Sequence, residues 1–118
     1  MMRLKAEIWV KAYVRRCNGD GAHAVVARHG DDDAGAIYVK VTRGDRMAHV
    51  FAPAPAGIDE TAGERRWVCI TGETPITERD ADARLEREFR YDSDMWLVEV
   101  EDRSGRHFLD DWLLEQET

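Results

Sequence analysis

The chain of 118 residues has little cysteine and no long apolar run, and these absences exclude several classes of protein. Its two cysteines, Cys17 and Cys69, form neither a CxxC motif nor a zinc-binding pattern. The longest apolar runs contain four residues, far fewer than the roughly 20 of a transmembrane helix. The first 18 residues lack the apolar stretch of about 7–15 residues that marks a signal peptide. We therefore expect a soluble, cytoplasmic protein with reduced thiols.

Motifs that carry well-defined chemistry are also missing. The sequence contains no phosphate-binding GxGxxG or GxxxxGK[ST] loop, no GxSxG nucleophile elbow and no HExxH zinc motif. Acidic clusters at 31–33, 99–102 and 110–111 are typical of charged surfaces, because a metal site needs oxygens that converge at one point. We therefore predict no metal, no cofactor and no catalytic residue. Enzyme activity stays uncertain, and a non-enzymatic role is favoured.

The net charge of −7 is distributed unevenly along the chain. Residues 1–18 carry +4, residues 19–72 carry −2 and residues 73–118 carry −9. An acidic surface repels nucleic-acid phosphates, so we do not expect nucleic-acid binding. The basic and acidic ends are expected to attract each other, either within one fold or across a subunit interface.

Residues 3–18 support two interpretations. Apolar residues at every second position from Leu4 to Val14 predict a strand, whereas Ala6, Trp9 and Cys17 share one face of a helix. We expect a strand over 3–8 that is followed by a helix over 9–18, which ends before Gly19.

The rest of the chain alternates between strand patterns and one clear helix. Further strands are predicted over 22–28, 36–43, 47–52, 65–71 and 95–101, of which 22–28 is expected to be largely buried. The prolines in 53–57 end one strand and lead into a polar loop over 58–64. Thr74 or Thr77 can cap a helix that runs to Tyr91. The segment 107–114 fits a strand or a short helix, and we favour the helix.

This order of elements, β-α-β-β-β-β-α-β-α, predicts a single α+β domain over residues 1–118. The expected sheet is mostly antiparallel, with about five to six strands and two to three helices.

Four residues form the candidate ligand-binding site. Arg15, Arg16, Arg28 and His29 are expected where the first helix ends near the strand 22–28, and arginines there can hold a carboxylate or a phosphate. A small anionic-ligand-binding protein or a cryptic enzyme is therefore the alternative hypothesis. Cys17 can serve as a nucleophile if a neighbouring arginine lowers its pKa. The simpler interpretation makes both cysteines small core residues, and a disulfide between them stays open as a further alternative.

A second group of residues is the candidate interface. Four tryptophans are many for this length, and Trp9 and Trp112 can anchor a contact with another protein. If residues 3–18 are helical, Leu4 and Ile8 form a second apolar stripe among basic residues. Our first hypothesis is therefore a non-enzymatic interaction protein that self-associates, most simply as a homodimer, with an unidentified protein partner as a further option.

Several stretches of the sequence are distinctive when taken together: RLKAEIWVKAYVRRC, GAIYVKVTR, FAPAPAG, ERRWV and MWLVEVEDRSGRHFLDDWLL. FAPAPAG and HFLDDWL are the most specific of them. These stretches resemble a group of short, stand-alone bacterial proteins known only as a domain of unknown function. The similarity covers nearly the whole chain, from Arg3 to about Leu114. It implies a small bacterial protein and brings no catalytic residues with it.

Overall fold

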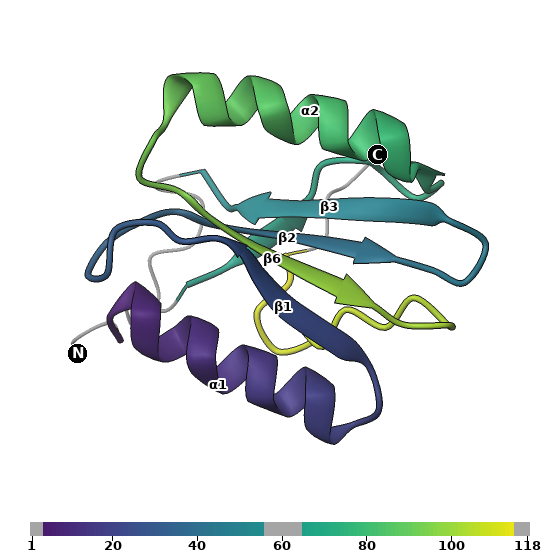
Figure 1. Ribbon diagram of the computed structural model, residues 1–118, viewed down its shortest axis with the longest axis horizontal. Helices are drawn as coiled ribbons and strands as arrows, with labels where there is room; N and C mark the ends of the chain where they lie inside the picture. Colours follow the sequence, from purple (N-terminus) through teal and green to yellow (C-terminus); the bar gives the residue numbers. More distant parts are fainter. Residues whose placement is uncertain (1–3, 56–64, 115–118) are drawn as a thin grey trace.

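A computed structural model describes residues 4–55 and 65–114, in which two helices enclose one sheet (Figure 1). Helix α1 covers one face of the sheet and helix α2 covers the other. The polar loop predicted over 58–64 lies outside the described residues. In chain order the elements are α1 (Ala6–Gly19), β1 (His23–Arg28), β2 (Ile37–Thr42), β3 (Met47–Pro53), β4 (Trp67–Cys69), β5 (Ile76–Thr77), α2 (Glu78–Tyr91) and β6 (Trp96–Glu101).

The six strands form one mixed sheet. Its order is β1-β6-β2-β3-β4, and the short β5 pairs with β3. Only the central pair, β2 and β6, is parallel among the described strands, and the other pairings are antiparallel. The predicted α+β class and mostly antiparallel sheet are therefore confirmed, with six strands and two helices. No helix in 4–55 or 65–114 has the length and apolar character needed to cross a membrane.

The strand predicted over 3–8 is wrong, because α1 already begins at Ala6. The helical pattern prevails: Ala6, Val10 and Cys17 are completely buried, whereas Ile8 from the alternating pattern is half exposed. The start of α1 has no side-chain cap. Instead, the backbone N–H groups of Ala6 and Glu7 donate to backbone carbonyls in the 31–33 loop. This partner for the first turn comes from a distant part of the chain, so no local signal marks the start of the helix.

Helix α2 begins where its capping residue predicts. The side chain of Thr77 accepts a hydrogen bond from the N–H of Asp80 at 3.1 Å, so the second of the two candidate caps is used. Nine of the 14 residues of α2 are charged, and only Ala81 and Leu85 are buried. The helix therefore has a narrow apolar stripe toward the sheet.

The helix predicted over 107–114 is also wrong. Phe108 has a φ of 59°, which interrupts any regular helix, and Leu113 forms a parallel bridge with Trp67. The N–H of Trp67 donates to the carbonyl of Trp112, and the N–H of Leu114 donates to the carbonyl of Trp67. The segment therefore closes the edge of the sheet at β4, which is also shorter than the predicted strand over 65–71.

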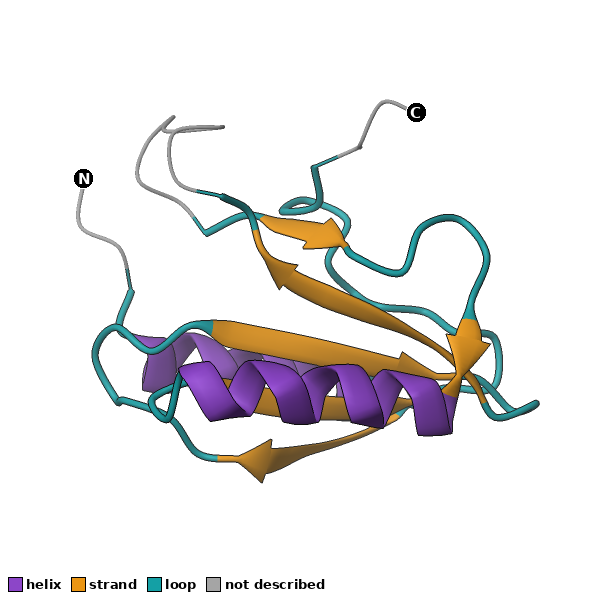
Figure 2. Ribbon diagram, turned by 90° about the horizontal axis from the view of Figure 1, so that it is seen from above, coloured by secondary structure: helices purple, strands orange, loops and turns teal. Residues whose placement is uncertain are grey.

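Strand β1 forms the other edge and is not largely buried, contrary to expectation. Val25 and Val26 are 40% and 43% exposed, and Figure 2 shows β1 outside the part of the sheet that α2 crosses. The side-chain amide of Asn18 accepts from the N–H of Ala24 and donates to its carbonyl. This amide and an irregularity in the pairing after Val26 protect the edge from pairing with another strand.

Each face of the sheet has its own core. The core under α1 is large and aromatic, and Trp9 stacks on Tyr13 and contacts Trp67 and Trp112. The core under α2 is small and centres on Leu85, with buried residues from β3 and β6 around it. The alternation of side chains along β2 and β6 divides their residues between these two cores.

Candidate functional site

The structure does not bring the four predicted ligand-binding residues together. Arg15 and Arg16 lie in the last turns of α1, which connects to the beginning of β1. Arg28 and His29 lie at the far end of β1. The predicted group is therefore split between opposite ends of that strand.

Arg28 and His29 contact different parts of the molecule. The guanidinium carbon of Arg28 lies 4.5 Å from the centre of the Phe89 ring, so this side chain links β1 to α2. His29 is exposed, its Nε2 lies 2.7 Å from a carboxylate oxygen of Asp32, and its ring lies 4.0 Å from that of Trp96. Neither residue lines either of the two clefts described below.

Arg16 borders a cleft of about 440 Å³ at the end of α1, which we call the helix-end cleft. Arg106, His107 and Ser104 line it from the opposite side. Arg106 is held by two contacts: its Nη2 lies 2.7 Å from a carboxylate oxygen of Asp102 and donates to a carbonyl of the α1–β1 connection. The side chain of Arg16 makes no ion pair with any residue of the described ranges. The cleft thus contains a fixed arginine and an unpaired one.

His107 is held in one tautomer. The N–H of Leu109 donates to its Nδ1 at 2.9 Å, so the neutral ring has its proton on Nε2. Tyr13 fixes the backbone by donating its hydroxyl to the His107 carbonyl. Burial lowers the pKa of His107 despite the nearby charge of Asp110. At neutral pH the imidazole can therefore donate one hydrogen bond to an anion from Nε2 without being charged.

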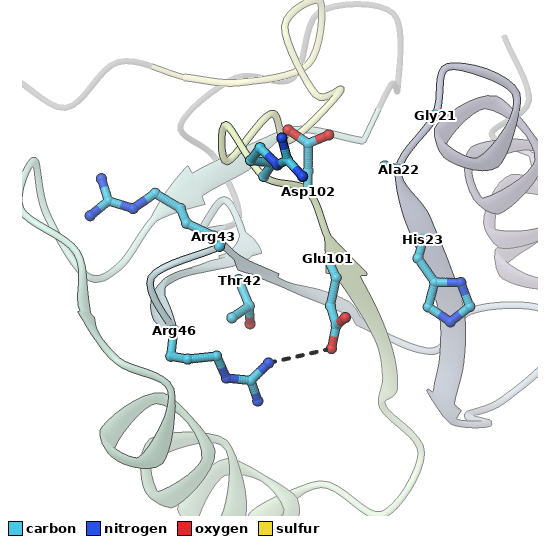
Figure 3. A pocket seen from close by; sticks show the side chains of 10 residues that line it. Gly21, Ala22, His23, Thr42, Arg43, Arg46, Glu101 and Asp102 are labelled. Carbon is cyan, nitrogen blue, oxygen red and sulfur yellow. Dashed lines mark ion pairs between the residues drawn. The ribbon is translucent and has the colours of Figure 1, made fainter.

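A second cleft of about 340 Å³, the strand-end cleft, lies on the other side of the 102–106 turn (Figure 3). Glu101 lies opposite His23 in one pairing and opposite Thr42 in the other, which places the three side chains in a row. Figure 3 shows Arg46 pointing to Glu101, with a separation of 3.8 Å, while Arg43 points away. Three arginines and two carboxylates line this cleft. Arg46 pairs with Glu101 and Arg43 pairs with Asp45, so two of the three arginines already have partners.

Beside the strand-end cleft, Lys40 is the centre of a buried ion network. Its side chain is 3% exposed, and its Nζ lies 2.7 Å from Asp82, 3.0 Å from Glu78 and 3.1 Å from Glu99. Arg46 contacts Glu78 as well. Burial alone would lower the pKa of Lys40, but its three carboxylate partners raise it above the ordinary value. A lysine held charged in this way is neither a base nor a nucleophile, so the network stabilises the fold rather than performing catalysis.

The predicted interface residues separate into exposed and buried ones. Leu4 and Ile8 are 54% and 50% exposed; Ile8 lies in the first turn of α1, and Leu4 lies just before the capping residue Lys5. Trp9 is 7% exposed, and its ring lies 5.6 Å from that of Trp112, which is half buried. The tryptophans therefore pack in the α1 core, and Leu4 and Ile8 remain available at the surface.

Both cysteines are free, so the disulfide considered from the sequence is not formed. Cys17 is completely buried, and burial raises the pKa of its thiol despite the neighbouring Tyr13 hydroxyl and the charge of Arg16. The lowered pKa that a nucleophilic Cys17 would need is therefore absent. Cys69 is partly buried and lies beside His49, a contact for which the sequence carries no local signal.

Comparison with known proteins identifies the family. A family model described as "Protein of unknown function (DUF1491)" matches residues 4–110. The chain belongs to this family. The resemblance to a domain of unknown function is thereby confirmed, and the DUF1491 family contributes no assigned activity or site residues. No curated protein matches the chain.

Solved structures of DUF1491 proteins and of a further relative share the fold. A crystal structure of a DUF1491 protein from Caulobacter crescentus CB15 is 42% identical, with a TM-score of 0.78, and the match covers 97% of this chain and 100% of that one. An NMR structure from the same organism is 45% identical, with a TM-score of 0.79, covering 98% and 100%. The solution structure of Atu0922 from A. tumefaciens is 33% identical, with a TM-score of 0.80, covering 98% of both chains.

Sequence reasoning placed a site near the end of the first helix but found only part of the helix-end cleft. It included Arg16 and missed Arg106 and His107, which are about 90 residues away in the chain. The spacing of Asp102 and Arg106, four residues apart in a turn, is a local signal for their pairing. The approach of that turn to α1 has no local signal, because it depends on where β6 ends in the sheet.

Proposed function

We propose that the chain is a non-enzymatic protein-interaction module that binds an acidic partner through the outer face of α1. The observation that carries this proposal is the exposure of Leu4 and Ile8. Ile8 lies on the side of α1 that faces away from the core, and Leu4 is exposed just before the helix begins. Large exposed apolar side chains that lie close together are typical of contact surfaces. Ala12, also exposed, extends the stripe by one turn.

The charges around this stripe favour an acidic partner. Lys5 pairs with Asp33 and Lys11 pairs with Glu7, while Arg15 and Arg16 form no ion pair with the described residues. The surface of α1 is therefore positive in a chain whose net charge is −7. A partner with acidic residues around apolar anchors complements both properties.

Self-association, the form of this function predicted from the sequence, is disfavoured in its simplest geometry. A two-fold contact between two α1 helices places the same unpaired arginines of both copies on one interface. Trp9, one of the predicted interface residues, is also committed to the core of its own chain. A homodimer is therefore an alternative outcome of the experiment below, and the cytoplasmic location stays a prediction.

The expected affinity is modest. Completing the burial of two half-exposed aliphatic side chains contributes about 1 kcal/mol each, and each exposed ion pair contributes less than about 1 kcal/mol. Such a contact is transient and weakens as salt screens the arginines.

The experiment is a titration with a designed acidic amphipathic helical peptide, followed by amide chemical shifts and calorimetry. We expect shifts along α1, weaker binding at high salt, and about tenfold weaker binding for Ile8→Asp. Val25→Asp is the matched control, because Val25 is similarly exposed but lies on β1. A basic peptide with the same apolar residues should not bind.

Two results would contradict the proposal. If Ile8→Asp and Val25→Asp bind the acidic peptide equally well, the α1 face is not the docking surface. If the chain forms a dimer by light scattering that Ile8→Asp dissociates, the occupant of this face is a second copy rather than an acidic partner.

The helix-end cleft favours a second candidate function, the binding of a small anion. Arg16 is unpaired among the described residues, Arg106 is fixed, and Nε2 of His107 carries a proton in the neutral ring, so donors from three residues border one cleft. Asp20 and Asp110 also line the cleft, and Asp110 lies 4.0 Å from that Nε2, so these two carboxylates oppose the binding of an anion there. Phosphate or citrate should raise the melting temperature of the protein. Arg16→Ala should abolish this increase, whereas Arg15→Ala, one residue away and outside the lining, should preserve it. Equal effects of both substitutions would reject the cleft as the site.

A further inference from the structure

The pairing of β3 with β4 places a thiol beside an imidazole. Phe51 and Cys69 are directly opposite each other in this antiparallel pair, so His49 lies diagonally across from Cys69. The Sγ of Cys69 lies 3.4 Å from Nδ1 of His49. The hydroxyl of Thr71 is 2.7 Å from the same Nδ1 and 3.3 Å from the sulfur. Three groups that can exchange protons therefore lie in mutual contact.

The hydrogen bonds of this group determine where each proton resides. The N–H of Val50 donates to the oxygen of Thr71, so the Thr71 proton is directed to either Nδ1 or the sulfur. The thiol of Cys69 donates to the carbonyl of Gly72 at 3.4 Å. At rest, Thr71 can donate to Nδ1 of a neutral His49, which makes Nδ1 the unprotonated nitrogen of the ring. This nitrogen has one lone pair, so it can accept the thiol proton only after the Thr71 hydroxyl turns away.

We propose that Cys69 is a nucleophilic thiol with His49 as its base, forming a covalent modification site for uncharged soft electrophiles. In the reaction, the sulfur forms a bond to the electrophilic carbon and the leaving group departs with its electron pair. The thiol proton passes to Nδ1 of His49. The Thr71 hydroxyl turns from Nδ1 to the sulfur and stabilises negative charge there. No oxidant or metal is needed for this step.

The groups around His49 keep it in the form that a base requires. Burial lowers the pKa of His49, and the positive charge of Arg43 and the proximity of His107 lower it further. Arg43 follows β2 and His107 lies in the segment after β6, so these groups reach His49 from two other elements. His49 is therefore neutral at pH 7 and able to accept a proton.

Cys17 is a contrasting thiol in the same chain. It is completely buried, next to Tyr13 and without a histidine partner, whereas Cys69 is only partly buried. The difference makes Cys17 an internal reference, because an electrophile that reaches Cys69 should leave Cys17 unmodified while the chain is folded. This site is also separate from the outer face of α1, so its test does not depend on the proposed interaction function.

The experiment measures the rate of carbamidomethylation of each cysteine by iodoacetamide, resolved by peptide mass spectrometry, from about pH 6 to about pH 10. An ordinary thiol with a pKa of about 8.5 is only about 1% thiolate at roughly two pH units lower. We expect Cys69 at low pH to react at least about tenfold faster than a cysteine in an unstructured peptide of the same local sequence. At the high end of the range the two rates should agree within about twofold, because solvent hydroxide is then abundant and the help of His49 no longer limits the reaction.

His49→Gln separates catalysis by the imidazole from a structural role. It should slow the low-pH reaction of Cys69 about tenfold and leave the high-pH rate within about twofold of the unsubstituted protein. Thr71→Val should cause a smaller loss with the same pH dependence. Unchanged melting temperatures and unlabelled Cys17 show that each variant is folded.

Two outcomes overturn the proposal. One is a pH profile for Cys69 that coincides with that of the free peptide. The other is a His49→Gln variant that changes the rates at low and high pH by the same factor, since that result reports altered access to the sulfur rather than loss of a base.

Discussion

The two faces of the sheet are stabilised by different interactions. Beneath α1, tryptophans and aliphatic residues form a large apolar core. Beneath α2, a small apolar cluster around Leu85 adjoins Lys40 and its three carboxylates. The chain thus concentrates its aromatic residues on one face and packs a highly charged helix on the other face through a small apolar cluster together with ion pairs. The comparison shows how a sequence with 35% charged residues can still enclose a sheet on both sides.

The largest loss of stability is expected for Trp67→Ala, in the core beneath α1. Trp67 is 1% exposed, contacts the ring of Trp9 at 4.4 Å between centroids, and donates its Nε1–H to the carbonyl of Ile37 at 2.8 Å. Removing the ring should lower the free energy of unfolding by about 3–5 kcal/mol, as measured by urea denaturation. Trp112→Ala is the matched control in the same stack and should cost less, because Trp112 is only half buried. Equal losses would show that burial does not determine the contributions of these rings.

An intermediate loss of stability is expected for Lys40→Met, on the face of the sheet that α2 covers. The substitution keeps the length of the side chain but leaves Glu78, Asp82 and Glu99 without their shared cation. Because these carboxylates are partly exposed, we expect a loss of about 1–3 kcal/mol at pH 7, less than for a fully buried pair. A variant as stable as the unsubstituted protein would show that Lys40 contributes no net stabilisation.

The same substitution should change how stability depends on pH. Burial alone would raise the pKa of Glu78, but the hydrogen bond and charge of Lys40, with Arg46, hold it below the ordinary 4.5. This stabilisation is present above pH 4.5 and is lost as the pH falls through the lower pKa of the folded state. The pKa of Lys40 is raised, so its contribution is present below 10.5 and is lost as the pH rises through the raised value. The unsubstituted protein and Lys40→Met should therefore differ most in free energy of unfolding between about pH 4.5 and about pH 10.5. The difference should become smaller in acid.

The smallest loss of stability is expected for Arg28→Gln, where β1 contacts α2. Arg28 contacts the Phe89 ring through its guanidinium group, and its Nε is buried without a hydrogen-bond partner. Loss of the cation–π contact should cost about 0.5–1 kcal/mol and be offset in part by removal of the unpaired Nε. Thermal unfolding should therefore shift by only a few degrees, if at all. A loss as large as that for Lys40→Met would mean that this contact, rather than the ion network, holds α2 to the sheet.

Most strands and helix α2 were predictable from the sequence because their signals are local. Alternation indicates β2 and β6, the turn at 43–46 indicates β3 as the next strand of a hairpin, and a threonine followed by acidic residues indicates the start of α2. The strand β5, only two residues long, carries no periodic signal and was missed. The candidate sites were less predictable, because Cys69 meets His49 only through the register of β3 and β4.

The sequence by itself determined the α+β class, the family and the number of strands and helices to within one, since apolar periodicity and turn residues act over a few neighbouring positions. The tertiary structure decided where α1 begins and which conformation the segment 107–114 adopts. The first turn of α1 is capped by carbonyls of the 31–33 loop, and the segment 107–114 pairs with β4 instead of forming a helix. In both places the backbone finds its hydrogen-bond partner far away in the chain, so the local pattern of side chains could not reveal the outcome.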